Sequence, residues 1–155
     1  MLPSPEVKYL MSRAPLKVSD GADFFELRAL EYGEPPGMDH GDLRLGVSVR
    51  FDGIADAYDQ VWIAASDWRG FILALKRVEQ ERKGEASLLS ISPGEFELRL
   101  RIVNVKGHPV AYGHLSRYHF LPSLPTIRSS VPYYVKVDPS MLRELVDSFL
   151  ELGQR

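Results

Sequence analysis

The fold is decided by a stretch in which apolar and polar side chains alternate, Leu43-Arg-Leu-Gly-Val-Ser-Val-Arg-Phe51. Successive side chains of a β-strand point to opposite faces of its sheet, so this alternation predicts a strand with one buried and one solvated face. The pair Asp52-Gly53 follows, and Asp-Gly is a strong signal for the tight turn of a hairpin. We therefore expect residues 58–64 to return as the neighbouring antiparallel strand.

Further strands are expected on both sides of this hairpin. Upstream, residues 24–30 alternate in the same way, and the chain then meets Gly33-Glu-Pro-Pro-Gly37, where two prolines prevent continued pairing. Downstream, strands are predicted at residues 86–91, 96–102, 110–118 and 133–137, with a proline-containing loop at residues 120–132. Because most of the connections are short, consecutive strands are expected to pair as antiparallel hairpins.

Two segments change to a helical period. Between residues 67 and 83, apolar side chains fall three and four positions apart and make one stripe. Ser66 is expected to cap this helix, and Gly84 to end it. A second helix is predicted after Asp138-Pro139, since aspartate is a favourable cap and proline is tolerated in the first turn. This helix is expected to end at Gly153.

The predicted order of elements is β-β-β-α-β-β-β-β-α. Each helix has a single apolar stripe, which it can bury only against the sheet. The chain is therefore predicted to be α+β, with a mainly antiparallel sheet, curved or sandwich-like, and two helices packed on it. Residues 1–22 contain three prolines and no sustained period, so we expect an extended N-terminal arm, followed by one domain over residues 23–155.

The amino-acid composition of the chain limits the classes of function that can be expected of it. The 155 residues are 45% hydrophobic and 26% charged, which is typical of a globular domain, and the net charge is −2. A chain without a basic excess is not expected to coat nucleic acid. No apolar run is long enough to cross a membrane, and prolines interrupt the N-terminal residues where a signal peptide would need an apolar stretch. We therefore expect a cytoplasmic protein that binds neither nucleic acid nor membrane.

No motif predicts catalysis or a cofactor. The chain has no cysteine and four histidines, and it lacks phosphate-loop, dinucleotide and zinc-protease signatures. Asp39-His40-Gly41-Asp42 is the most metal-like cluster, but it lacks the alternating oxygen ligands of a calcium loop. It is interpreted as a solvated loop, with metal binding by Asp39, His40 and Asp42 as an alternative. We predict no enzyme, no cofactor and no metal site.

Charge is distributed unevenly along the sequence. Residues 20–67 hold eleven acidic and three basic side chains, whereas residues 68–136 hold eleven basic and five acidic ones. Such asymmetry can steer a charged partner, unless the two halves lie together and neutralise each other.

The order of features over residues 24–152 resembles the WapI-type family of small bacterial immunity proteins, which accompany polymorphic contact-dependent toxins. The resemblance rests on four stretches that follow one another along the chain: Asp39-His-Gly-Asp-Leu-Arg-Leu-Gly-Val-Ser-Val49, Ser66-Asp-Trp-Arg-Gly-Phe-Ile-Leu-Ala-Leu75, Ser92-Pro-Gly-Glu-Phe-Glu-Leu-Arg-Leu100 and Tyr134-Val-Lys-Val-Asp-Pro-Ser-Met-Leu-Arg-Glu-Leu145. Where family members tend to carry an Asn-Trp pair before the first alternating strand, this chain has Gly41-Asp42.

The resemblance implies a non-enzymatic protein that binds and neutralises one cognate toxin domain. Toxins that cut nucleic acid are often basic around their sites, so acidic side chains are the candidate contacts on grounds of charge. These candidates are Asp39, Asp42, Asp52, Asp56 and Asp59. The alternative is a module that binds a small molecule or protein in a pocket between sheet and helices. Its candidate lining is aromatic: Trp62, Trp68, Tyr112, Tyr118, Tyr133 and Tyr134.

Overall fold

The computed structural model describes residues 14–33, 41–53, 55–119, 122 and 127–154. Within these residues, eight strands form two four-stranded antiparallel sheets, in each of which the strands lie in chain order. Sheet A contains β1 (Leu16–Asp20), β2 (Asp23–Gly33), β3 (Asp42–Phe51) and β4 (Ala55–Ile63). Sheet B contains β5 (Glu85–Leu89), β6 (Phe96–Ile102), β7 (Pro109–His119) and β8 (Ile127–Lys136).

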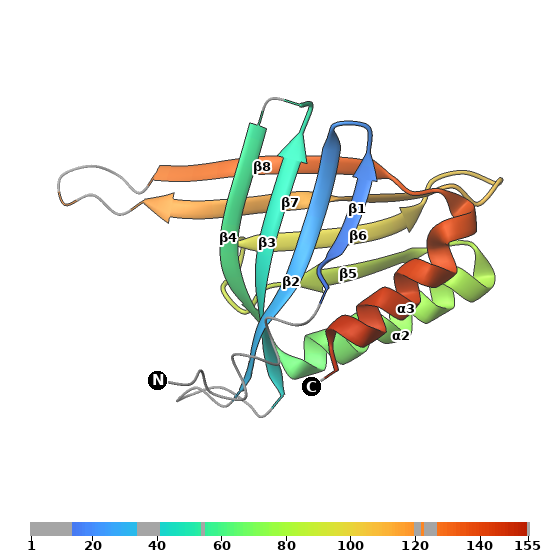
Figure 1. Ribbon diagram of the computed structural model, residues 1–155, viewed down its shortest axis with the longest axis horizontal. Coiled ribbons are helices and arrows are strands. Elements are labelled where there is room, and N and C mark those ends of the chain that lie inside the picture. Colours follow the sequence, from blue (N-terminus) through green and yellow to red (C-terminus); the bar gives the residue numbers. More distant parts are fainter. Residues whose placement is uncertain (1–13, 34–40, 54, 120–121, 123–126, 155) are drawn as a thin grey trace.

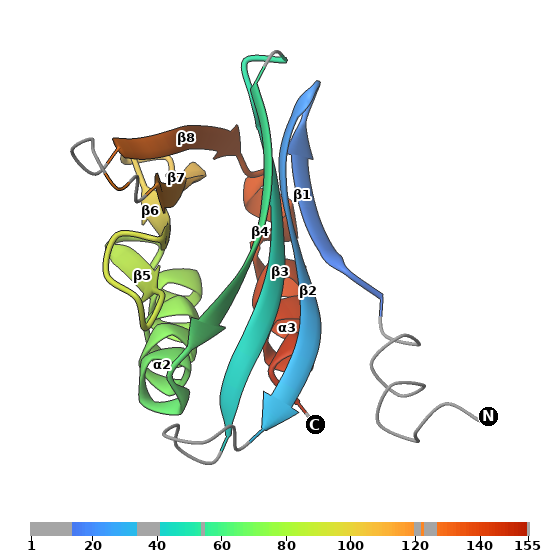
Figure 2. The ribbon, with the colours of Figure 1, turned by 90° about the vertical axis from the view of Figure 1, so that its left-hand side faces the viewer.

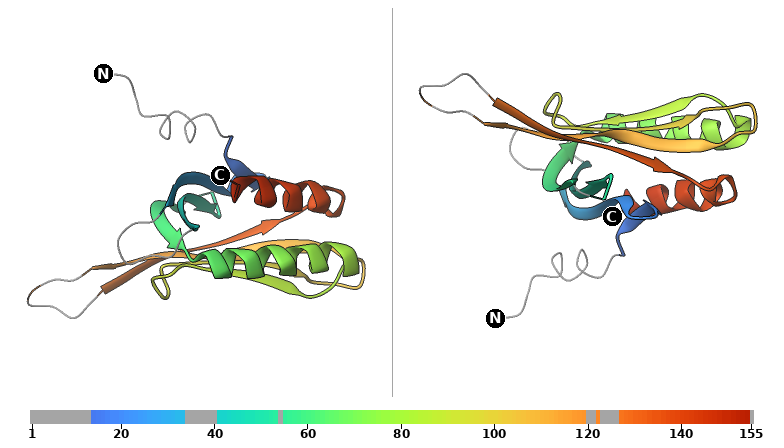
Figure 3. Two further views of the ribbon diagram at one scale, coloured as in Figure 1. Left: turned by 90° about the horizontal axis from the view of Figure 1, so that it is seen from below. Right: turned by 90° about the horizontal axis from the view of Figure 1, so that it is seen from above.

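Two α-helices complete the domain. Helix α2 (Ala65–Glu81) connects the two sheets, and α3 (Leu142–Leu152) follows the short 3₁₀ helix η1 (Pro139–Met141) after the last strand. The strands of sheet A run across those of sheet B, as the views in Figures 1 and 2 show. Helix α2 lies along β5, and α3 lies beside α2 on the side of β1 (Figure 3). The predicted α+β class, with antiparallel sheets and two packed helices, is confirmed.

The core lies between the inner faces of the two sheets and continues between the helices. Phe25 of β2 and Tyr133 of β8 meet there, with ring centroids 5.8 Å apart. Trp68 and Phe71 of α2 pack against Phe149 of α3, the Phe71 and Phe149 rings edge to face at 5.1 Å. These contacts bury the apolar stripe that the sequence predicts on each helix.

Two parts of the predicted strand pattern are wrong. Leu16–Asp20, expected to belong to an N-terminal arm, form strand β1 in register with β2, while residues 1–13 of the predicted arm lie outside the described residues. Ile127–Lys136 form one strand, although residues 127–132 belong to the stretch 120–132, for which Pro122, Pro125 and Pro132 predict a loop. Proline is tolerated there because β8 is the edge strand of sheet B.

Helix α2 begins differently from the prediction. It starts at Ala65, and Ser66 lies inside its first turn instead of capping it. The carboxylate of Asp42, at the start of β3, accepts a hydrogen bond from the Ala65 backbone N–H at 2.9 Å. The cap therefore comes from a residue distant in sequence, which local patterns do not reveal.

The last helix begins as predicted. Asp138 accepts a hydrogen bond from the Ser140 backbone N–H at 2.9 Å, with Pro139 at the first helical position. The first turn is 3₁₀ and continues into α3. The Ser140 hydrogen bonds hold the pKa of the Asp138 carboxyl below its ordinary value, which fits an ionised cap.

Candidate functional site

The two hairpin turns of sheet A lie side by side at one end of the sheet (Figure 1). The Gly53 backbone N–H, in the β3–β4 turn, donates a 3.0 Å hydrogen bond to the Asp23 carboxylate, at the β1–β2 turn. Asp52 and Gly53 adopt left-handed backbone angles, with φ of 58° and 70°, which aspartate and glycine tolerate better than most residues. The two turns are therefore tied together and present their side chains on one rim.

Four carboxylates gather at this end, which we call the acidic hairpin end: Asp20, Asp23, Asp52 and Asp56. Asp20 and Asp52 are exposed, and Asp56 is 61% exposed. Arg50 binds the Asp56 carboxylate with two hydrogen bonds, at 2.6 and 3.1 Å. The hydrogen bond from Arg50 lowers the pKa of Asp56, so this carboxylate stays ionised.

Beside these carboxylates, the outer face of sheet A carries two aromatic rings. The Phe24 ring lies between two cations, with the Lys17 ammonium 4.4 Å and the Arg50 guanidinium 5.6 Å from its centroid. Tyr58 is 56% exposed and lies over Gly46, where a Cβ would come within 3.0 Å of the tyrosine oxygen. Tyrosine and arginine are enriched in protein–protein interfaces and at the positions that contribute most to binding.

The five acidic candidates from the sequence do not form one site. Asp52 and Asp56 lie at the acidic hairpin end, whereas Asp39 falls outside the described residues. Asp42 is 3% exposed, and it caps α2. Asp59 lies on β4 and holds Arg117 of β7 in an ion pair of 2.9 Å, which links sheet A to sheet B.

The sequence did not predict Asp20 and Asp23 as site residues, because residues 1–22 were expected to form an arm and no hairpin was expected between Asp20 and Asp23. An Asp-Gly step at Asp20-Gly21, with Leu16 and Val18 alternating before it, was the available signal for a hairpin. When β1 pairs with β2, the turn between them places Asp20 and Asp23 next to Asp52 and Asp56.

On the outer face of sheet B, the side chains around Arg99 form a paired network. Arg99 contacts Glu85 at 2.6 Å and also Glu97, and Tyr112 donates a 3.2 Å hydrogen bond to Glu85. His114 Nδ1 lies 3.5 Å from the Glu97 carboxylate. A shallow depression of about 470 Å³ adjoins these side chains, and the buried Nε2 of His114 in its lining has no hydrogen-bond partner among the described residues.

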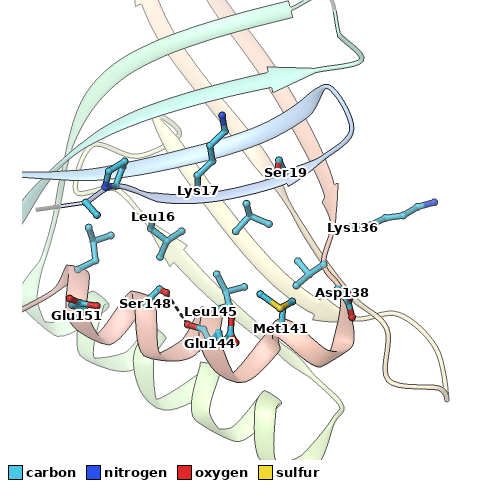
Figure 4. A pocket seen from close by; sticks show the side chains of 15 residues that line it. Leu16, Lys17, Ser19, Lys136, Asp138, Met141, Glu144, Leu145, Ser148 and Glu151 are labelled. Carbon is cyan, nitrogen blue, oxygen red and sulfur yellow. Dashed lines mark hydrogen bonds between the residues drawn. The ribbon is translucent and has the colours of Figure 1, made fainter.

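A groove of about 740 Å³ runs between strand β1 and helix α3 (Figure 4). It occupies the kind of position that the alternative prediction required, between a sheet and a helix, but none of the six predicted aromatic residues lines it. Trp68 and Tyr133 are buried in the core, Tyr112 adjoins the depression on sheet B, and Tyr134 is exposed. The side chain of Tyr118 lies outside the described part of the chain.

The described residues contain neither a cluster suited to a metal ion nor a helix suited to span a membrane. In the described ranges, no three His, Asp or Glu side chains come close enough to share a metal ion, and His40 lies outside these ranges with Asp39. Of the described helices, none is both long and apolar enough to cross a lipid bilayer.

Comparison with known proteins identifies no relative of this chain. No family model, no curated protein and no solved structure matches the chain.

Proposed function

We propose that the protein is a non-enzymatic, immunity-like binding protein that neutralises a cognate bacterial toxin domain. In this proposal the toxin docks on the acidic hairpin end and the adjoining outer face of sheet A. The observation that carries the proposal is that two turns, separate in sequence, bring four carboxylates together beside Phe24 and Tyr58.

Charge complementarity supports this surface. The four carboxylates outnumber the two nearby cations, Lys17 and Arg50, so this end favours a basic partner. Opposite charges steer such a partner to the surface and speed association, especially at low salt. Phe24 and Tyr58 would then supply the apolar contact area that charges alone do not.

Rigidity also supports binding without turnover. The hydrogen bond from Gly53 to Asp23 holds the two turns together, and the Arg50 pair holds Asp56. A surface whose side chains are already held in place loses less conformational entropy on association. A basic toxin site covered by this surface would be blocked without any bond being made or broken. The proposal places this encounter in the bacterial cytoplasm, where a delivered toxin would act.

The test begins with the gene next to this one. We expect it to encode a secreted protein whose C-terminal domain forms a tight complex with the purified chain, measured by isothermal titration calorimetry. An adjacent secreted toxin domain that does not bind the chain, or the absence of any such gene, would contradict the proposal.

Two charge variants locate the surface. Asp20→Asn with Asp52→Asn removes two carboxylates while asparagine keeps the turn geometry accessible. We expect the affinity to fall about tenfold at low salt, mainly through slower association. The matched control, Glu81→Gln with Asp147→Asn, removes two exposed charges from the helices and should leave the affinity within twofold. Equal effects of the two pairs would show that net charge, not this surface, governs binding.

The β1–α3 groove supports a second candidate function, that of a module binding a ligand between sheet and helix. Its volume and its apolar floor are the observations in favour. The two functions use different surfaces and can coexist in one chain.

A further inference from the structure

We propose that the exposed side of the Tyr58 ring, on the outer face of sheet A, binds the guanidinium group of an arginine from the basic partner. This inference rests on the docking surface proposed above, and it names the partner side chain that the surface recognises. Tyr58 lies on β4, two residues after Asp56 of the acidic hairpin end.

The Tyr58 side chain lies across the neighbouring strand β3. Gly46 of β3 leaves the space for it, because a Cβ at this glycine would come within 3.0 Å of the Tyr58 oxygen and 3.4 Å of the ring atom Cε2. The same Cβ would meet Leu30 Cδ1, from β2, at 3.4 Å, so the tyrosine and the leucine together cover the glycine. Tyr58 nevertheless remains 56% exposed, so a partner can reach the side of the ring that is turned away from the sheet.

Hydrogen bonds hold the tyrosine in this position. Gln60 Nε2 donates to the Tyr58 hydroxyl at 3.3 Å, and Gln60 Oε1 accepts a hydrogen bond from Arg44. The Arg44 guanidinium in turn lies 3.4 Å from the Glu31 carboxylate. A ring that is already held in place loses less conformational entropy when a partner binds.

Aromatic rings on this face of the sheet attract cations. The Phe24 ring has the Lys17 ammonium 4.4 Å and the Arg50 guanidinium 5.6 Å from its centroid. A cation over an aromatic face is attracted by the negative charge of the ring's quadrupole. Within the described residues, no cation lies over the Tyr58 ring, so this ring can accept one from a partner.

The neighbouring carboxylate favours arginine over lysine. Asp56 and Tyr58 are alternate residues of β4, so their side chains point to the same face of the sheet. Asp56 accepts two hydrogen bonds from Arg50, at 2.6 and 3.1 Å, and an ionised carboxylate has lone pairs for about four. A planar guanidinium can stack on the ring and still donate from its edge to Asp56, whereas an ammonium has no plane to stack.

The first experiment observes Tyr58 itself. The full-length chain, with isotope-labelled tyrosine rings, is titrated at low salt with capped hexa-arginine and hexa-lysine peptides, and the ring signals are followed by NMR. We expect hexa-arginine to shift the Tyr58 signals saturably. Hexa-lysine, which carries the same charge, is expected to bind at least threefold more weakly.

The second experiment changes the charge of the ring face without changing its shape. Tyr58→Phe keeps the ring and should change the affinity for hexa-arginine less than twofold. Trifluorophenylalanine at position 58 keeps the shape of phenylalanine but withdraws electrons from the ring face. We expect it to bind hexa-arginine about threefold more weakly than Tyr58→Phe does, since an exposed cation–π contact is worth a few-fold in affinity.

A matched leucine pair controls for the loss of an exposed aromatic ring. Tyr58→Leu keeps an apolar side chain but removes the ring, and it should weaken hexa-arginine binding about threefold. Tyr134→Leu makes the same change on sheet B, where Tyr134 is 44% exposed, and should leave the affinity within 1.5-fold of the wild type, roughly the error of such a titration. Circular dichroism and the urea midpoint check that each variant folds.

The outcomes separate this site from the docking surface as a whole. Equal binding by Tyr58→Phe and the trifluorophenylalanine variant, or equal affinity for the two peptides, overturns the arginine site. If Asp20→Asn with Asp52→Asn still weakens hexa-arginine binding in that case, only the arginine site is wrong. If those asparagines also leave the affinity unchanged, the acidic hairpin end is not a surface for basic partners, and the proposed function fails with it.

Discussion

The acidic hairpin end of sheet A and the Arg99 network on the outer face of sheet B differ in how far their charges are paired. On sheet B, Arg99 lies between Glu85 and Glu97, and Tyr112 completes the network. At the acidic hairpin end of sheet A, two turns bring together four carboxylates, of which Asp56 is bound by Arg50. The Arg99 network of sheet B therefore satisfies its own charges, whereas the acidic hairpin end keeps an excess of carboxylates that a partner can neutralise.

This difference shows why net charge along the sequence is a poor guide to a binding surface. The basic half of the chain contains all four strands of sheet B, yet Arg99 in this sheet is held by two glutamates. The acidic half contains Asp42 and Asp59, which have structural partners in Ala65 and Arg117. A docking surface is distinguished by charged side chains that have no partner of opposite charge within the protein. Which side chains these are depends on which turns the fold brings together.

The largest expected effect comes from comparing two glycines that lie under tyrosines, one in each sheet. A Cβ on Gly113 of sheet B would lie 1.9 Å from the Glu97 backbone oxygen and 2.8 Å from the Tyr133 oxygen. Because backbone cannot move aside cheaply, Gly113→Ala should lower the free energy of unfolding by roughly 3 kcal/mol, measured by urea denaturation.

Gly46→Ala is the matched change in sheet A. Its Cβ would meet the exposed Tyr58 side chain at 3.0 Å and no backbone atom closer than that. Tyr58 can move outward, so we expect a loss below about 1 kcal/mol. Equal losses at the two positions would show that the outer face of sheet A is packed as tightly as sheet B.

The second prediction compares two aspartates of the acidic half. Asp42→Ala removes the acceptor for the Ala65 N–H at a buried helix start and should cost about 1–3 kcal/mol of unfolding free energy. Asp42→Asn keeps an acceptor oxygen and should cost less. Asp52→Ala, at an exposed turn, should cost under about 1 kcal/mol, since only the left-handed backbone angle is affected. A smaller loss for Asp42→Ala than for Asp52→Ala would contradict the structural role of Asp42.

The smallest predicted effect concerns pH and the network on sheet B. Burial raises the pKa of Glu85, but hydrogen bonds from Arg99 and Tyr112 outweigh it, so the pKa is below its ordinary value. A carboxyl group whose pKa is lower in the folded than in the unfolded state stabilises the fold at pH values above its unfolded pKa, about 4.5 for Glu85. This stabilisation is lost as the pH falls through the pKa of the folded state.

Glu85→Gln therefore tests the network by its pH dependence. The variant should be less stable than the wild type by under about 1 kcal/mol near pH 7, because the pair is partly exposed. The difference should shrink as pH falls below about 4.5 and Glu85 becomes protonated. Thermal unfolding from pH 7 to pH 3 measures it, and a difference that grows toward acid would contradict the assignment.

Much of the fold could be predicted, because it is encoded in local periods. The alternation at residues 43–51 and 96–102 predicted β3 and β6, and the apolar stripes predicted both helices. Strand β1 was missed because only Leu16 and Val18 alternate within its five residues. The first half of β8 was missed because serines and Pro132 resemble a loop, although an edge strand accepts them.

The candidate site was predictable only in part, for a related reason. Asp52 and Asp56 were singled out by charge, but Asp20 and Asp23 join them only when β1 pairs with β2. Asp42 was grouped with them because the sequence does not show that it caps a helix beginning at Ala65. Both features depend on contacts between residues that are distant in sequence. The apolar periodicity of the sequence does not reveal such contacts.

The proposed docking surface is tested most directly by hydrogen–deuterium exchange of the chain, alone and in complex with the toxin domain that the proposal expects the neighbouring gene to encode. We predict that binding slows amide exchange in the β1–β2 and β3–β4 turns and leaves the amides of β6 and β7 unchanged. Protection that appears on β6 and β7, with both turns of sheet A exchanging as in the unbound chain, would contradict the account.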